Sequence, residues 1–282
     1  MSGLYAEVRG SGPALVLLHG WGLNLRVWDG LAAMLQDRFR IVAIDLPGHG
    51  RSDWLPGRSS LEEQAAQIRE TVSAVTESYF LLGWSLGGQI ALELAAGRPE
   101  GLQRLVLIAA TPRLPAGPDW PHGAPPERLA QQAAGLRADY RRTVSDFLEL
   151  QVRGSAEAAA ALSQLRTALF AHGARSVSNS PHRGTGLERQ LENPGRPQLD
   201  ALACGLELLR NTDLRPLLAQ ITLPTLVIAG EYDRVTMPAA SRALADALPN
   251  ARYVEIRRAA HAPFLSHLPQ LGALLTDFLP PA

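Results

Sequence analysis

Residues 83–87, Gly-Trp-Ser-Leu-Gly, have the G-x-S-x-G pattern of a serine nucleophile held on a sharp turn. The pattern lies between an apolar run at 79–82 and a helical pattern at 89–96, the strand-turn-helix context that such a serine requires. Because glycine lacks a Cβ atom, the strand and the helix can approach each other closely around Ser85. Taken alone, the short pattern also fits a solvated serine in a glycine-rich turn.

A carboxylate and an imidazole follow far downstream, each after a predicted strand. Asp233 comes three residues after Gly230, beyond the apolar run 226–229, and His261 follows the predicted strand 252–256. The alternative for Asp233 is a role in capping a turn.

The chemistry of acyl transfer explains why these residue types belong together. A serine hydroxyl is a weak nucleophile at neutral pH and needs an adjacent base. An imidazole can take the proton and later return it, while a carboxylate fixes the imidazole tautomer and stabilises the imidazolium. The chain order Ser85, Asp233, His261 is that of α/β-hydrolases, so we predict these three residues as a catalytic triad.

Two backbone amides are predicted to hold the oxyanion, those of Trp21 and Leu86. Trp21 lies in the His-Gly-Trp-Gly segment 19–22, directly after the apolar run 14–18, where hydrolases of this kind place their second donor. Leu86 begins the helix that follows the nucleophile, so the helix dipole adds to its effect. We expect the Trp21 indole to line the acyl pocket and His19 to be a structural turn residue.

Apolar runs alternate with helical patterns over the first 110 residues. This alternation predicts an α/β fold with a mostly parallel central sheet flanked by helices on both faces. Strands are expected at 4–9, 14–18, 41–44, 79–82 and 104–108, and helices at 31–36 and 61–74. The loop 45–52 is dense in turn-forming residues, and we expect Asp45 to hold it in place.

The pattern changes between residues 113 and 215. Prolines cluster at its start, and helical patterns follow at 127–138, 140–151, 156–170 and 199–209, interrupted by a polar stretch at 171–197. We therefore predict a core in two parts, residues 1–112 and 216–282, with a helical cap inserted at 113–215. A cap above the carboxyl ends of the strands, where open α/β sheets bind ligands, would exclude water and shape the acyl pocket.

Arginines give the predicted cap a small positive excess, with eleven arginines against eight acidic residues between 113 and 197. Arg137 and Arg141 are four residues apart, which would place them on one helix face. A solvated helix surface is the ordinary explanation. The alternative is a docking surface for an acidic partner that carries the substrate.

Composition narrows the class of protein further. The chain is 46% apolar, as in ordinary globular proteins, and its 27 basic residues balance 27 acidic ones, so nothing indicates nucleic-acid binding. The single cysteine cannot form an intramolecular disulfide, and the seven histidines lack metal-ligand spacing. No signal-peptide pattern or membrane-length apolar run is present. We expect a cytoplasmic monomer without a metal, cofactor or membrane association.

With these residues identified, the chain resembles the α/β-hydrolase superfamily and, within it, the pimeloyl-[acyl-carrier protein] methyl ester esterase family of biotin synthesis. The resemblance covers nearly the whole chain and is most specific at 17–24, 83–88, 142–144, 147–151, 205–209, 213–215 and 259–264. It implies the α/β-hydrolase fold with a cap, the same triad and the same oxyanion donors. It also implies a substrate channel that is formed with Ser85, His261, Trp21 and Leu86 and is lined by Phe147, Leu148, Glu149, Leu150 and Gln151.

The family also implies a docking surface for a carrier protein, because its cap arginines bind the phosphopantetheine and the acidic surface of the carrier. Arg142 matches such a position, and Arg137 and Arg141 are further candidates. Asp146 stands where the family pattern has arginine, and the following helix is alanine-rich at 158–161. These departures concern the docking surface rather than the chemistry.

We therefore expect a serine carboxylesterase that hydrolyses the terminal methyl ester of a pimeloyl chain held on acyl-carrier protein. A broad short-chain carboxylesterase or a C–C bond hydrolase could use the same triad. A ligand receptor that kept the fold is the non-enzymatic alternative, and the intact Ser85, Asp233 and His261 argue against it.

Overall fold

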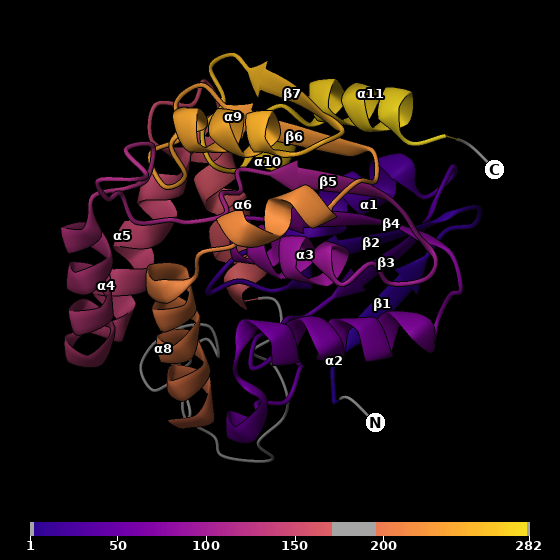
Figure 1. The fold of residues 1–282 in the computed structure, drawn as a ribbon. Helices are drawn as coiled ribbons and strands as arrows, with labels where there is room; N and C mark the ends of the chain where they lie inside the picture. Colours follow the sequence, from indigo (N-terminus) through magenta and orange to yellow (C-terminus); the bar gives the residue numbers. More distant parts are fainter. Residues whose placement is uncertain (1–2, 171–195, 281–282) are drawn as a thin grey trace.

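The computed structural model describes residues 3–170 and 196–280, whose arrangement is shown in Figure 1. Seven strands form one sheet in the order β1-β3-β2-β4-β5-β6-β7. Their bounds are β1 Ala6–Arg9, β2 Ala14–Leu18, β3 Arg40–Ile44, β4 Tyr79–Trp84, β5 Leu102–Ile108, β6 Thr225–Gly230 and β7 Ala251–Ile256. Only β1 pairs antiparallel with its neighbour, β3. The prediction of a mostly parallel central sheet is confirmed.

The central strands are apolar throughout because both of their faces are covered. Every residue of β2, β4 and β6 is buried, which explains why they read as continuous apolar runs rather than alternating ones. Within β2, Leu15 and Leu17 belong to one apolar cluster, whereas Val16 and Leu18 belong to the other. This division follows from the two-residue period of side chains along a strand.

Helices cover the two faces of the sheet (Figure 1). Helices α2 (Leu61–Ser73), α3 (Leu86–Ala96) and α9 (Pro238–Ala247) contribute side chains to one cluster, and α1 (Asp29–Leu35) and α11 (Leu268–Phe278) contribute to the other. Short helical turns complete this part of the chain: η1 Leu25–Trp28, η2 Pro56–Arg58, η3 Arg215–Gln220 and α10 Pro263–Ser266. Among the described residues, no helix is long and apolar enough to cross a membrane.

Among the described residues, four further helices lie between β5 and β6: α4 Pro126–Ala138, α5 Tyr140–Val152, α6 Ala158–Phe170 and α8 Arg196–Asn211. Helix α4 contacts both α5 and α8, and α5 contacts α6; Figure 1 shows α4, α5 and α8 grouped beside the sheet. Each coincides with a helical segment expected from the sequence. Most of the polar stretch at 171–197 lies outside the described residues, and the division of the chain at 112 and 215 stays a prediction.

Arg137 and Arg141 do not share a helix, so the expectation of one common face is wrong. Helix α4 ends before Asp139, whose backbone is extended at φ −151°. The Asp139 side chain then caps α5 by accepting a hydrogen bond from the backbone N–H of Arg142, at 3.0 Å. An aspartate favours this position because it satisfies a free amide at the start of a helix.

Glycines allow the ends of β2 and β4 and the start of α3 to touch. A Cβ atom on Gly83 would lie 2.4 Å from the carbonyl oxygen of Gly87, and one on Gly87 would lie 2.5 Å from those of Leu18 and His19. These carbonyl oxygens belong to the backbone, so they cannot move aside as flexible side chains would. Close approach of three elements therefore requires glycine at both positions.

The loop after β3 is folded around the buried carboxylate of Asp45, as expected from its sequence. This carboxylate accepts hydrogen bonds from the backbone N–H groups of Leu25, at 2.7 Å, and Arg51, at 2.8 Å. The Ser52 hydroxyl donates to the Asp45 carbonyl at 2.6 Å. Burial raises the pKa of Asp45 to about 6, although both amide hydrogen bonds act in the opposite direction.

We expect Gly87→Ala to lower the free energy of unfolding by about 1–3 kcal/mol, because its methyl group would collide with the backbone after β2. Urea unfolding measures the change. Gly57→Ala is the matched control, since a Cβ atom on Gly57 would meet nothing within 4 Å. Equal stability of the two variants would contradict the close approach described here.

A pH-dependent contribution to stability is expected from Asp45. Because its pKa of about 6 in the folded protein exceeds the value of about 4 in an unfolded chain, the folded state binds the proton more tightly. This contribution is fully present below about pH 4 and is lost as the pH rises through about 6. Relative to Asp45→Asn, wild type should gain roughly 2 kcal/mol of unfolding free energy between about pH 7.5 and about pH 4.5. A difference between the two proteins that is the same at both pH values, measured by urea unfolding, would contradict the shift.

Candidate active site

Ser85 is the single residue between the end of β4 and the start of α3. Its backbone conformation is one that residues with side chains rarely adopt. Its φ is 56° and its ψ is −116°. The turn is held by hydrogen bonds from Ser85 N–H to the carbonyl of Ile108, at 3.1 Å, and from Gly88 N–H to the carbonyl of Ser85, at 2.9 Å. Such strain persists where the surroundings over-determine the backbone, as they do at a nucleophile turn.

Trp21 and Leu86 lie next to each other beneath helix α8. A Cβ atom on Gly205 would be 2.7 Å from Trp21 Cδ1 and 3.6 Å from Leu86 Cδ2. The Trp21 indole N–H donates to the carbonyl of Leu202 at 2.8 Å, which anchors the ring to α8. The structure thus brings together the two residues whose amides were predicted to hold the oxyanion.

The turn that contains Trp21 also lies close to Ser85. A Cβ atom on Gly20 would lie 3.3 Å from the Cβ atom of Ser85. His19 braces this turn, because its Nδ1 donates to the carbonyl of Gly20 at 2.8 Å and its Nε2 accepts from the backbone N–H of Leu46 at 3.0 Å. Accepting at Nε2 requires a neutral ring, so the arrangement agrees with the structural role expected for His19.

His261 and Asp233 form a buried pair. His261 Nδ1 lies 2.8 Å from Asp233 Oδ2, and the two residues are 1% and 2% exposed. The other carboxylate oxygen accepts hydrogen bonds from the backbone N–H groups of Val235, at 2.8 Å, and Thr236, at 3.0 Å. The carboxylate is therefore held by three donors and fixes the orientation of the imidazole.

His261 also lies beside the turn that carries Ser85. The indole N–H of Trp84, the residue before Ser85, donates to the carbonyl of His261 at 2.8 Å, and the two rings are 5.5 Å apart. His261 Nε2 is buried without a hydrogen-bond partner, so the bond to the Ser85 hydroxyl is not formed in this state. Catalytic hydrogen bonds in free enzymes are often long and tighten when substrate binds.

Helix α5 brings two of its five predicted channel residues to this site. The Phe147 ring packs edge-on against Trp21, with centroids 5.1 Å apart. The carbonyl of Gln151 accepts a hydrogen bond from His261 N–H at 2.9 Å. The Gln151 side-chain amide is buried, and neither its oxygen nor its nitrogen has a partner.

Five consecutive helical residues cannot share one face. Leu150 lies on the face of Phe147 and lines with it a groove between α4 and α5, whereas Leu148 is buried in the apolar cluster of the opposite face of the sheet. Glu149 is exposed and lies 3.2 Å from the guanidinium of Arg166. The structure does not bring Glu149 to the site.

The sequence analysis missed Gly205. Because this glycine has no Cβ atom, the Trp21 indole can pack directly against α8. The available signal was an isolated glycine inside a helical pattern, which often marks close packing. Within residues 3–170 and 196–280, no group of three His, Cys, Asp or Glu side chains could hold a metal ion.

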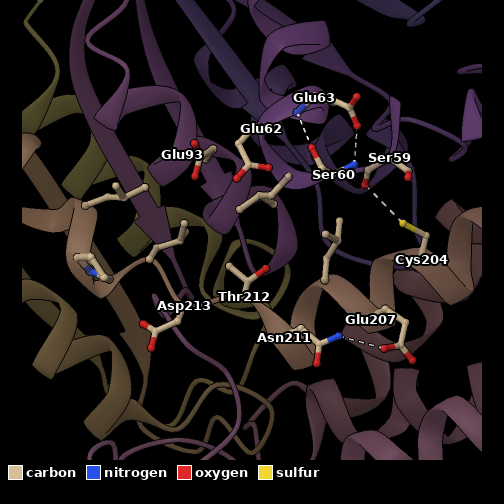
Figure 2. Close-up of a pocket in the computed structure, with 15 residues that line it drawn as sticks. Ser59, Ser60, Glu62, Glu63, Glu93, Cys204, Glu207, Asn211, Thr212 and Asp213 are labelled. Carbon is tan, nitrogen blue, oxygen red and sulfur yellow. Dashed lines mark hydrogen bonds between the residues drawn. The ribbon is translucent and has the colours of Figure 1, made fainter. Parts of the chain in front are cut away.

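A separate crevice of about 680 Å³ lies between α8 and the helices α2 and α3 (Figure 2). Five carboxylates and no basic side chain line it: those of Glu62, Glu63, Glu93, Glu207 and Asp213. Burial and the nearby Glu62 raise the pKa of Glu93. The crevice contains none of the predicted triad and would repel an anionic ligand.

Comparison with known proteins agrees with this geometry. Residues 13–268 match the model of the alpha/beta hydrolase fold family. The pimeloyl-[acyl-carrier protein] methyl ester esterase of Nitrosomonas europaea is 37% identical over 268 residues, covering 94% of this chain and 95% of that protein. The esterase of the same name from Xanthomonas oryzae pv. oryzae is 39% identical over 278 residues, covering 98% of each chain.

Among solved structures, the bromoperoxidase from Bacillus anthracis is similar with a TM-score of 0.83 and 20% identity, covering 98% of this chain and 95% of that chain. At this identity the similarity concerns the fold alone. The two esterases identify the family more closely, because each is similar to this chain over nearly the full length of both proteins. The chain therefore belongs to the α/β-hydrolase fold family and, within it, to the family of the pimeloyl-[acyl-carrier protein] methyl ester esterases.

Proposed function

We propose that this protein hydrolyses the methyl ester of a pimeloyl chain carried on acyl-carrier protein, with Ser85, His261 and Asp233 as its catalytic triad. The observation that carries the proposal is the buried His261–Asp233 hydrogen bond, which leaves His261 Nε2 unpaired beside the Ser85 turn. The relatives named for this activity support the choice of substrate.

Acylation begins when the Ser85 hydroxyl attacks the carbonyl carbon of the methyl ester. His261 Nε2 takes the hydroxyl proton, and the Asp233 carboxylate stabilises the resulting imidazolium. The backbone N–H groups of Trp21 and Leu86 hold the oxyanion, each contributing about 3 kcal/mol to the lowering of the barrier. The ester C–O bond then breaks, and methanol leaves with the proton from His261.

Deacylation repeats the sequence with water. His261 Nε2 takes a proton from the water molecule, which attacks the carbonyl carbon of the acyl-serine. The same two amides hold the second oxyanion, and Ser85 leaves with the proton from His261. The products are the free carboxyl end of the pimeloyl chain and the regenerated hydroxyl, and no cofactor takes part in these steps.

The acyl chain is proposed to lie against Trp21 and Phe147, whose rings are in edge-on contact. The unpaired amide of Gln151 is buried on the same helix, one turn further along from Phe147. A buried amide without a partner is costly, so a polar group of the substrate would be favoured there. Glu149 is left out of the proposed channel, since it pairs with Arg166 on the exposed side.

The carrier is proposed to dock where α4 and α5 meet. Arg137 and the pair Arg141–Arg142 flank the turn at Asp139 and are exposed. A groove of about 310 Å³ between these helices reaches from Arg142 to Phe147, the ring that contacts Trp21. The crevice beside α8 is the weaker candidate for docking an acidic carrier, because carboxylates and no basic side chain line it.

One observation favours a weaker dependence on the carrier than the family pattern implies. Arg142 lies 3.7 Å from Asp146, one helical turn along, so part of its charge is already neutralised. Electrostatic attraction mainly speeds association. A broad short-chain carboxylesterase with the same triad is therefore the second candidate function.

Ser85→Ala should abolish turnover of a short-chain p-nitrophenyl ester, apart from residual hydrolysis of about 10³-fold over water by the remaining groups. Initial rates and covalent labelling by a fluorophosphonate are the measurements, with labelling expected in wild type and absent in the variant. Ser73→Ala is the matched control, because its hydroxyl is exposed on α2 and bonds only to a backbone carbonyl. Near-wild-type turnover by Ser85→Ala would refute the mechanism.

Wild type should hydrolyse a carrier-bound pimeloyl methyl ester with a higher kcat/KM than the free methyl ester. Arg142→Ala should lower that preference by about three- to tenfold, because the docking surface loses a cation. Arg166→Ala is the control, since this exposed arginine lies on α6 and pairs with Glu149. If wild type shows no preference for the carrier-bound ester, the broad esterase becomes the better description.

A further inference from the structure

The loop that carries His261 contains a strained residue that is not glycine. After β7 ends at Ile256, the chain turns sharply, and Ala259 N–H donates to the carbonyl of Ile256 at 3.3 Å. Arg258 occupies the third position of this turn with φ at 60°. That conformation normally favours glycine and costs other residues about 1–2 kcal/mol, so its neighbours must hold it in place.

The loop that carries Asp233 forms hydrogen bonds with this turn on one side. Arg258 N–H donates to Glu231 Oε2 at 2.7 Å. Two backbone bonds accompany this contact, from Glu231 N–H to the carbonyl of Ile256 at 3.0 Å and from Tyr232 N–H to the carbonyl of Ala259 at 2.8 Å. Glu231 is therefore the side chain that satisfies the strained residue, two positions before the triad carboxylate.

The cap forms hydrogen bonds with the loop that carries His261 on the other side. The carbonyl of Arg258 accepts a hydrogen bond from Ala156 N–H, between α5 and α6, at 3.2 Å. His261 N–H donates to the carbonyl of Gln151 on α5 at 2.9 Å. The peptide groups of Arg258 thus connect three parts of the chain: the loop that carries Asp233, the loop that carries His261, and the cap.

We infer that Glu231 is a positioning residue for the reaction: by holding Arg258 in its left-handed conformation, the Glu231 carboxylate fixes the loop that places His261 on Asp233. This inference rests on the triad of the proposed function. It assigns Glu231 no contact with the substrate. The carboxylate acts only as a hydrogen-bond acceptor for one backbone amide.

Loss of this acceptor should affect chemistry more than substrate binding. Without it, Arg258 loses the side chain that holds it in this conformation and can relax toward a right-handed one, and the two residues between it and His261 would follow. A displacement of about 1 Å in a catalytic group can cost as much as about 10²-fold in rate. The pocket residues Trp21 and Phe147 lie on other elements and would keep their contact.

The test compares Glu231→Ala, Glu231→Gln and Arg258→Gly, alone and combined, on a p-nitrophenyl ester. Glu231→Ala should lower kcat about tenfold and change KM by less than about twofold. Glu231→Gln keeps an oxygen acceptor and should stay within about threefold of wild type. In the Arg258→Gly background, Glu231→Ala should cost less than about twofold, because glycine adopts this conformation without help.

Glu255→Ala is the matched control. Glu255, on β7, also has a hydrogen-bonded carboxylate, but this one accepts from the Tyr253 hydroxyl, at 2.8 Å, rather than from a backbone amide of the Arg258 turn. Its kcat should equal that of wild type. Thermal unfolding of every variant separates loss of rate from loss of folded protein.

Three outcomes would overturn the inference: unchanged kcat in Glu231→Ala, an equal loss in Glu231→Gln, or no recovery in the Arg258→Gly background. Fluorophosphonate labelling of Ser85 separates these from failure of the proposed function. Absence of labelling in wild type contradicts the triad itself. Labelling of Glu231→Ala at the wild-type rate contradicts the role of Glu231 alone.

Discussion

A single buried hydrogen bond, between His261 Nδ1 and Asp233 Oδ2, is the contact on which the proposed site depends. Its two loops follow β6 and β7, which are neighbours in the sheet, so parallel pairing brings both loops to the same edge. Close packing reinforces this, because Gly230 leaves room for the carbonyl of Ala260. A buried carboxylate without partners would be very costly, and the amides of Val235 and Thr236 supply the remaining donors.

Local patterns in the sequence were sufficient to predict the fold and the sharp turn at Ser85. Strands such as 14–18 and 79–84 read as apolar runs because both faces of the sheet are covered, and Ser85 is marked by the glycines that its turn requires. Each of these signals depends on neighbours in sequence. The pairing of Asp233 with His261 could be anticipated only because their chain order is characteristic of one family.

Features that depend on contacts between distant elements could not be predicted. One error was local: the spacing of Arg137 and Arg141 suggested a common helix face, although the expected helices 127–138 and 140–151 already separate them and Asp139 caps the second. Glu149 lies within a family motif, yet the helical period turns it toward Arg166. Nothing in the sequence around Glu231 shows that its carboxylate meets Arg258, because that contact joins loops that are distant in the chain.

In the proposed function, helix α5 connects substrate recognition to the chemistry through its two faces. Its inner face presents Phe147 to Trp21 and the carbonyl of Gln151 to His261, while its outer face carries Arg142 and Asp146. Because the inner contacts involve packing and a backbone carbonyl, charges on the outer face can change without disturbing them. This separation explains how the outer surface could lack an arginine that the resemblance implies at Asp146 while the arrangement around His261 stays intact.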